Sequence, residues 1–193
     1  SQVSNSQPLA VTVDHCTIAD NSGGSAPVAV EVDGATLSVT HSIITGTVGE
    51  GILASNGALL TVLSTTFAVS GNSAIDADSS DVQILDSTLS GGVGPLVYLS
   101  SSSGPAEGNT FSNSSGTFAD GIQVVDGVFT IRNNIFASNA RAGVSLFAGT
   151  GGGAQAVITG NTFQSNVYGV LFNPARFVRM DSNLVKDNGR GVR

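Results

Sequence analysis

Two aspartates stand two residues apart in the segment Asp76-Ala77-Asp78. If this segment is a strand, both side chains point to the same face and lie about 7 Å apart along it. That separation is compatible with the paired carboxylates of glycosidases. Asp78 also opens the turn-like run Asp78-Ser79-Ser80-Asp81, where exposed acids are ordinarily solvated loop residues. Asp76 and Asp78 are therefore candidate catalytic residues. The alternative is that both are ordinary solvated loop residues.

Asp81 adds a third carboxylate to the same stretch. Calcium prefers oxygen ligands, so Asp76, Asp78 and Asp81 are also candidate calcium ligands. Their spacing matches no defined calcium-binding loop. We expect no obligatory metal or cofactor, with calcium at these three residues as the alternative.

The chain contains two histidines, His15 and His41. Both stand three residues before a large apolar residue of the repeat described below. Their rings are therefore expected within about 5 Å of each other if the repeats stack. A metal site would need a third ligand, for which Asp14 is the obvious neighbour, and a general base would need an orienting partner that the sequence does not identify. Stacking at the edge of a turn is the simpler interpretation.

An internal repeat must position these residues. Eight short segments each end on a large apolar anchor, and successive anchors lie 21 to 27 residues apart; they are Ile18, Ile44, Phe67, Leu89, Phe111, Phe136, Phe163 and Leu184. An alternating apolar run precedes most anchors, and a small polar residue, Gly or Ala and a second alternating run follow them. Turn pairs such as Asp33-Gly34 and Asn56-Gly57 separate the second run from the next repeat.

Repeats of this length without helix-length segments predict a single-stranded right-handed parallel β-helix. We expect an all-β domain over residues 9–193, with about eight coils and three short strands per coil. A tail at residues 1–8 would precede it, and the domain could be a fragment of a longer solenoid.

Alternation assigns side chains to the inside or the outside of this solenoid. Two residues before each anchor, a small polar residue points inward and is expected to form a hydrogen-bonded ladder; the eight are Cys16, Ser42, Thr65, Ser87, Asn109, Asn134, Asn161 and Ser182. Cys16 is thus interpreted as a small ladder residue and not as a nucleophile. In the second run, the expected outward column is Ala29, Leu53, Asp76, Val97, Gln123, Ser145 and Leu171.

Three sequence elements resemble the repeats of the pectate-lyase-like parallel β-helix superfamily: Asn109-Thr110-Phe111, the Phe-x-x-Asn of Phe136 to Asn139, and Gly143-Val144. The resemblance covers roughly residues 9 to 193. It implies the fold and leaves the function open, because the superfamily includes polysaccharide lyases, glycoside hydrolases, epimerases, phage tailspikes and surface adhesins. It also implies that acids and bases of an enzyme would lie on the outer face of one sheet. The polygalacturonase-like signatures Asn-Thr-Asp, Gly-His-Gly and Arg-Ile-Lys do not occur.

A threonine column is the second candidate site. The residue before the anchor points outward and is often threonine, as at Thr17, Thr66, Thr88, Thr110 and Thr162. Together with small residues after the anchor, these threonines would form a flat, weakly polar strip that could bind a glycan or ice. Threonine also has a high strand propensity, which by itself explains the column.

The charge of the chain limits its partners. A net charge of −7 argues against nucleic acid, and no apolar run of about 18 residues could span a membrane. Low Lys content with much Ser and Thr favours an extracellular or cell-surface location. All seven Lys and Arg residues lie at or after Arg132, whereas the acids are concentrated before Glu107. These opposite charges, with no capping helix at either end, predict head-to-tail self-association.

The repeat is clear in this sequence and a catalytic constellation is not. The sequence therefore favours a non-catalytic, secreted or cell-surface β-helix that recognises glycans or another surface partner. The main alternative is a polysaccharide lyase or glycoside hydrolase, and the second is an ice-binding protein. A cleft that held Asp76, Asp78 and a basic residue together would favour the enzyme.

Overall fold

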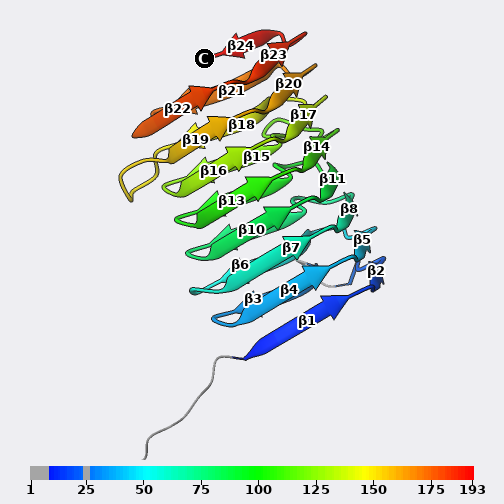
Figure 1. Cartoon of the computed structure of the whole chain (residues 1–193). Coiled ribbons are helices and arrows are strands. Elements are labelled where there is room, and N and C mark those ends of the chain that lie inside the picture. The colour runs from blue at the N-terminus through cyan, green and yellow to red at the C-terminus, as the bar shows by residue number, and fades with distance from the viewer. Residues whose placement is uncertain (1–8, 24–26) are drawn as a thin grey trace, which may run out of the picture.

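The computed structural model of the chain describes residues 9–23 and 27–193, and the tail predicted at residues 1–8 lies outside this part. The described residues form a right-handed parallel β-solenoid of about eight coils with three strands in each, as predicted (Figure 1). They contain no helix, and therefore none long and apolar enough to cross a membrane.

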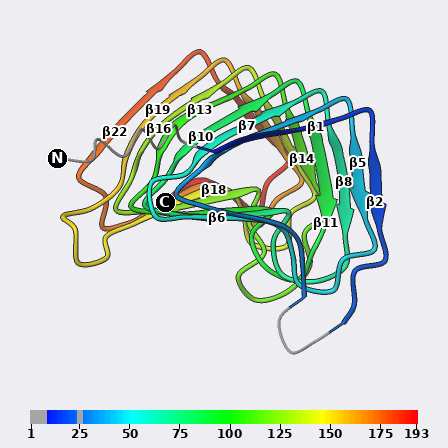
Figure 2. The same ribbon diagram turned by 90° about the horizontal axis from the view of Figure 1, so that it is seen from below.

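Each coil contributes one strand to each of three parallel sheets, which enclose the core when viewed along the axis (Figure 2). Sheet A comprises β1 Ala10–Asp14, β4 Thr36–Thr40, β7 Leu59–Leu63, β10 Asp81–Leu85, β13 Ser103–Glu107, β16 Val128–Arg132, β19 Gln155–Thr159 and β22 Phe177–Asp181. Sheet B comprises β2 Thr17–Ala19, β5 Ile43–Thr45, β8 Thr66–Val69, β11 Thr88–Gly91, β14 Thr110–Ser112, β17 Ile135–Ala137, β20 Thr162–Gln164 and β23 Leu184–Lys186. Sheet C comprises β3 Val28–Asp33, β6 Glu50–Ser55, β9 Ile75–Asp78, β12 Val97–Ser100, β15 Ile122–Val125, β18 Ala142–Phe147, β21 Tyr168–Asn173 and β24 Arg190–Val192.

The anchors of sheet B form one core column. Phe67, Leu89 and Phe111 are paired in register, and Phe136 and Phe163 continue the column. The Phe111 and Phe136 rings stack with their centroids 5.0 Å apart, and those of Phe136 and Phe163 stack at 4.9 Å. All four phenylalanines are fully buried. The predicted column is confirmed, with Leu89 separating Phe67 from the stack of three rings.

The predicted polar ladder runs along the corner between sheets A and B. The Asn134 backbone N–H and side-chain amide both donate to Asn161 Oδ1, at 2.9 and 3.0 Å, and Asn109 donates to Asn134 Oδ1 in the same way. The Asn134 amide also donates to the carbonyl of Ala106 at 2.9 Å. These bonds satisfy polar groups that are buried where the chain bends.

A second ladder occupies the corner between sheets B and C. Asn139 donates from its amide to Asn166 Oδ1 at 3.1 Å, and Asn166 donates to Asn188 Oδ1 at 3.0 Å. Asn139 and Asn166 belong to Phe-x-x-Asn elements, and Asn188 stands at the same place after Val185, so the sequence motif corresponds to a physical interaction between coils.

In the last coil the predicted register is wrong by one residue. Phe163 pairs with Val185, which faces the core, while Leu184 is exposed. Asn183, and not Ser182, therefore occupies the ladder and accepts from the Asn161 backbone N–H at 2.9 Å. Besides accepting from Asn161, the Asn183 amide donates to the carbonyl of Ile158 at 2.8 Å, as the Asn134 amide does to Ala106. At the start of the ladder Cys16 is exposed, but its backbone N–H donates to the Ser42 hydroxyl at 3.1 Å and its thiol donates to the Asp14 carbonyl at 3.2 Å.

The expected outward column of sheet C is wrong in two coils. Glu31, not Ala29, pairs with Leu53, and Ala29 packs against the core. In β12 the faces are reversed: Val97 is fully buried, and Tyr98 pairs with Asp76 on the outside. The cause is apolar burial, since Val97 and Leu99 both enter the core.

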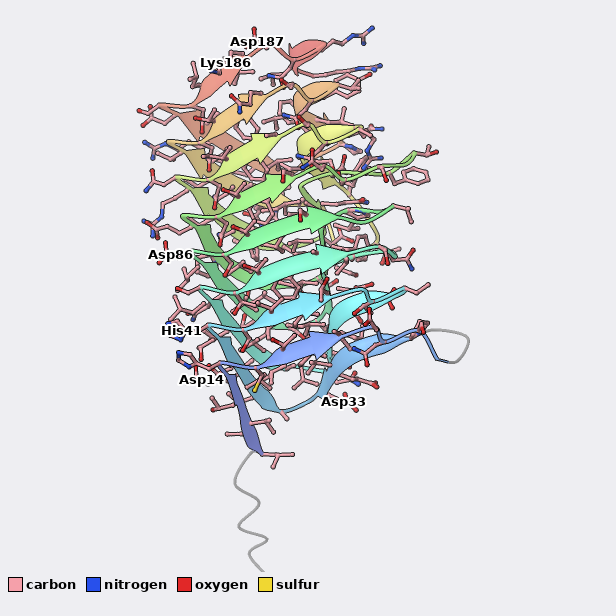
Figure 3. All side chains as sticks on the ribbon, turned by 90° about the vertical axis from the view of Figure 1, so that its right-hand side faces the viewer. Asp14, Asp33, His41, Asp86, Lys186 and Asp187 are labelled. Atoms are coloured by element: carbon pink, nitrogen blue, oxygen red, sulfur yellow. The ribbon has the colours of Figure 1, made fainter. Side chains whose placement is uncertain are left out.

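Charge is distributed along the solenoid axis because the coils follow the order of the sequence. Asp14 and Asp33 lie in the first coil, whereas Lys186 and Asp187 lie in the last (Figure 3). Head-to-tail association through these ends stays a prediction.

Replacing Phe136 with Ala should lower the free energy of unfolding by about 3 to 5 kcal/mol, because it leaves a cavity between two stacked rings. Urea titration monitored by far-UV circular dichroism measures this change. A loss below about 1 kcal/mol would contradict the buried Phe column.

Candidate functional site

The largest hollow among the described residues lies on the outer face of sheet C. This sheet C cleft has a volume of about 560 Å³ and is lined chiefly by Glu50, Asn72, Asp76, Tyr98, Phe118 and Gln123. Its size is within the range of small-ligand sites. Carboxylates, side-chain amides and two aromatic rings thus share one concave surface.

Strand register places three of these side chains in a row. Asp76 on β9 pairs with Tyr98 on β12, which pairs with Gln123 on β15. Each lies between two buried residues of its own strand, such as Ile75 and Ala77 around Asp76, so strand alternation directs it outward. Adjacent strands are about 4.8 Å apart, which brings the three side chains into one site from separate coils.

A loop forms one side of the cleft. Residues 113–121 connect β14 to β15, and they form a longer connection than residues 92–96 in the preceding coil or 138–141 in the next. Phe118 in this loop is 62% exposed and lines the cleft. The extra length therefore converts a flat sheet surface into a concave one.

Asp76 has an unusual environment in the cleft. Desolvation, followed by the negative charges of Glu50 and Asp78, raises the pKa of Asp76 to about 6. Desolvation also raises the pKa of Tyr98, and the charges of Asp76 and Asp78 add to this. Asp76 can therefore carry a proton at mildly acidic pH, as a general acid must.

The other predicted acids lie elsewhere. Asp78 is exposed at the end of β9 and does not line the cleft, where Glu50 takes the place beside Asp76. Asp81 begins β10 in sheet A and accepts a hydrogen bond from the Ser103 hydroxyl. Asp76, Asp78 and Asp81 do not converge into a three-ligand group. The residues that line the cleft include no lysine or arginine.

The predicted threonine column is present on the outside of sheet B. Its register links Thr66, Thr88 and Thr110 directly, while Ile43 and Ile135 interrupt the column before and after them. Thr17 and Thr162 occupy the same column in more distant coils. The threonines form a strip without any adjoining pocket among the hollows found in the described residues.

A buried ion pair next to the cleft was not predicted. The Asp120 side chain is 0% exposed and accepts from Arg141 Nε at 2.8 Å and from the Ala142 backbone N–H at 3.0 Å. The Arg141 guanidinium carbon lies 5.2 Å from the centroid of the Phe118 ring. Because both partners are fixed by several contacts, the pair anchors the loop that carries Phe118.

Arg141 also joins the cleft to a neighbouring pocket. Arg141 Nη2 lies 3.4 Å from Gln123 Oε1 at the edge of the cleft. On its other side Arg141 lines an arginine pocket of about 440 Å³, together with Phe147, Tyr168, Phe172 and Arg193. An acidic cleft and a basic pocket thus lie on either side of the Gln123–Arg141 contact.

Sequence reasoning missed Tyr98 because Val97 was assigned to the outside. It missed Phe118, Asp120 and Arg141 because they lie in or beside connections, outside the repeating columns. The available signal was the local lengthening of the connection at residues 113–121, since long solenoid connections are where pockets are built.

The family model described as "Right handed beta helix region" matches residues 28–185. The chain belongs to the right-handed β-helix family. The matched range contains the whole sheet C cleft and its Arg141–Asp120 anchor. Membership of the β-helix family specifies the architecture and no particular reaction.

Among solved structures, the chain is similar to the periplasmic alginate epimerase AlgG. The TM-score is 0.68 at 14% sequence identity, and the match covers 87% of this chain and 43% of AlgG. At this identity the likeness shows a shared β-helix fold, and the chain spans less than half of the length of that neighbour. No curated protein sequence matches the chain.

The raised pKa of Asp76 predicts a pH-dependent gain in stability on replacement with Asn. A carboxyl whose pKa is higher in the folded state stabilises the fold below its unfolded pKa of about 4, and this contribution is lost as pH rises through about 6. Asp76→Asn should therefore match the wild type at pH 4 and exceed it by about 1 to 2 kcal/mol at pH 8. The expected difference in unfolding free energy is smaller than the full pKa shift would give, because water reaches the carboxyl and screens its charge.

Urea denaturation of both proteins between pH 4 and 8 measures the difference. Asp86→Asn, at an exposed position that does not line the cleft, is the matched control for loss of a carboxylate. Wild-type and Asp76→Asn stability curves that stay parallel over this range would contradict the raised pKa.

Proposed function

We propose that this β-helix binds a polysaccharide in the sheet C cleft. The observation that carries the proposal is the composition of that cleft: two aromatic side chains, Tyr98 and Phe118, lie beside carboxylate and amide groups. Sugar rings have apolar faces that pack on aromatic rings and hydroxyls that hydrogen-bond to carboxylates and amides. A cleft of this chemistry, open on the side of a solenoid, accommodates an extended chain.

The arrangement along the axis favours an extended ligand over a small one. Asp76, Tyr98 and Gln123 come from three successive coils, and Arg141 continues the row toward the arginine pocket. A saccharide chain that follows the row would meet aromatic surface first at Tyr98 and Phe118. It would meet cationic and aromatic groups next at Arg141 and Tyr168.

Recognition of polysaccharide places the protein outside the cytoplasm, in the periplasm or at the cell surface. The composition of the chain supports this location, as does its fold similarity to a periplasmic enzyme that acts on alginate. The likeness in fold also makes alginate a sensible member of any ligand panel.

Binding to a panel of oligosaccharides, including alginate oligomers, tests the proposal by isothermal titration calorimetry. Tyr98→Ala and Phe118→Ala should each weaken binding about tenfold, because each removes roughly 60 Å² of apolar contact with the ligand. The matched control is Phe177→Ala, which truncates an aromatic residue that is 52% exposed on sheet A. This control should bind as the wild type does.

Two results would contradict the proposal. Equal loss of affinity in Phe177→Ala would mean that the cleft is not the specific site. Loss of binding in a folded Thr88→Lys/Thr110→Lys variant, with Tyr98→Ala unaffected, would place the site on the threonine strip of sheet B.

Catalysis is the second candidate function, and the pKa of Asp76 favours it. A partly protonated carboxyl beside Tyr98 in a saccharide cleft could act as a general acid in a lyase or glycoside hydrolase reaction. Incubation with the same polysaccharides, followed by assays for reducing ends and unsaturated ends, tests this activity. Product formation that Asp76→Asn abolishes without loss of binding would support an enzyme. Absence of product would contradict catalysis and leave saccharide binding as the proposed function of the cleft.

A further inference from the structure

Three side chains with metal-binding chemistry meet at the corner between sheets A and B in the first two coils. Asp14 Oδ2 lies 2.9 Å from His15 Nδ1, and Asp14 Oδ1 lies 3.2 Å from His41 Nδ1. One potential donor atom from each residue lies within 4.8 Å of the others. Among the described residues, no other group of three His, Cys, Asp or Glu side chains converges in this way.

Stacking of the coils brings the two histidines together although they are 26 residues apart in the chain. Their rings stack with centroids 4.9 Å apart and an angle of 23° between the planes. Asp14 and His41 lie on the same edge of the solenoid, at its N-terminal end (Figure 3). This confirms the expected proximity and places Asp14, the neighbour that the sequence indicated, beside both rings.

The position that the histidines occupy is constrained in every coil. The corresponding residue has a positive φ between 48° and 71° throughout: His15, His41, Ser64, Asp86, Gly108, Asn133, Gly160 and Ser182. Such a backbone favours small or turn-forming residues, and the other six coils have Ser, Asp, Gly or Asn. The two imidazoles of the chain thus stand in adjacent coils, at a column that otherwise holds small side chains, beside a carboxylate.

The carboxylate is oriented by a neighbouring hydroxyl. Thr40 Oγ1 donates to Asp14 Oδ1 at 2.5 Å, in the manner of the outer hydrogen bonds that orient metal-ligating carboxylates. The side chains of Asp14, His15 and His41 are 48%, 73% and 50% exposed, respectively. Small rotations can therefore bring their donor atoms to the distance of about 3.3 Å that neighbouring ligands have around one tetrahedral ion.

We propose that Asp14, His15 and His41 form a surface binding site for a zinc-class divalent ion. Two imidazole nitrogens and one carboxylate oxygen suit zinc, cobalt, nickel or copper, and they disfavour calcium and magnesium, which prefer all-oxygen sites. Three protein ligands leave at least one coordination position for water or for a group on a partner. The site lies away from sheet C and is independent of the saccharide cleft.

The test uses the full chain without an affinity tag, since a polyhistidine tag would itself bind the ion. Titration with Zn²⁺ in a calorimeter should give one site per chain, and Co²⁺ should give visible absorption bands that Zn²⁺ abolishes. Excess Ca²⁺ should not compete. His41→Asn and Asp14→Asn should each weaken Zn²⁺ binding at least tenfold.

His41→Asn is chosen because the same column already accommodates Asn133, so the fold should be retained. The matched control is Asp86→Asn, in the same column two coils further along (Figure 3). Asp86→Asn and Cys16→Ser should both bind Zn²⁺ as the wild type does. No binding by the wild type, unchanged binding in His41→Asn, or equal loss in Asp86→Asn or Cys16→Ser would overturn the assigned site.

Discussion

The register between successive coils is the constraint on which the rest of the structure depends. Every strand pairs in parallel with its counterpart in the next coil, about 4.8 Å away, so a residue's neighbours are set by its place in the coil. Apolar stacking alone would still allow a slip of two residues, which keeps every side chain on its own face. The asparagine ladders do not, because the Asn134 amide must reach both Asn161 and the carbonyl of Ala106. A slip of one residue would leave these buried polar groups unpaired, at a cost of about 1 to 3 kcal/mol each.

This regular frame makes two kinds of surface. Where connections are short, outward side chains form flat columns, such as the threonines of sheet B. Where a connection is long, as at residues 113–121, the extra chain stands beside the sheet and a cleft results. The buried Asp120–Arg141 pair fixes the end of that connection to the regular coils.

The fold was predictable because the same pattern of anchor, ladder and alternating residues recurs in eight successive coils. Anchor residues such as Phe111 and Phe136, and ladder residues such as Asn134, are each specified by burial and by a partner of the same type in the next coil. The register in the last coil was not predictable from the anchors, since Leu184 and Val185 are both apolar and only the ladder bond of Asn183 distinguishes them.

The site was less predictable, because its members do not repeat. Asp76 was found as an outward acid, but its companion in the cleft is Glu50 from the preceding coil and not Asp78 from its own strand. Tyr98 was missed because the sequence alone did not determine whether Val97 or Tyr98 faces the core. His15 and His41 are the reverse case: their proximity followed from the repeat, and the structure added the orientation of Asp14 toward both rings.

The central claim is that the outer face of sheet C, and not that of sheet B, receives a saccharide chain. Chemical-shift mapping of backbone amides on addition of the panel oligosaccharides tests this most directly, because it reports every strand at once. Binding in the sheet C cleft should confine the perturbations to β9, β12, β15 and residues 113–121, and they should extend toward Arg141 as the oligosaccharide lengthens. Perturbations centred on Thr88 and Thr110 in sheet B, with β12 and residues 113–121 unchanged, would contradict it.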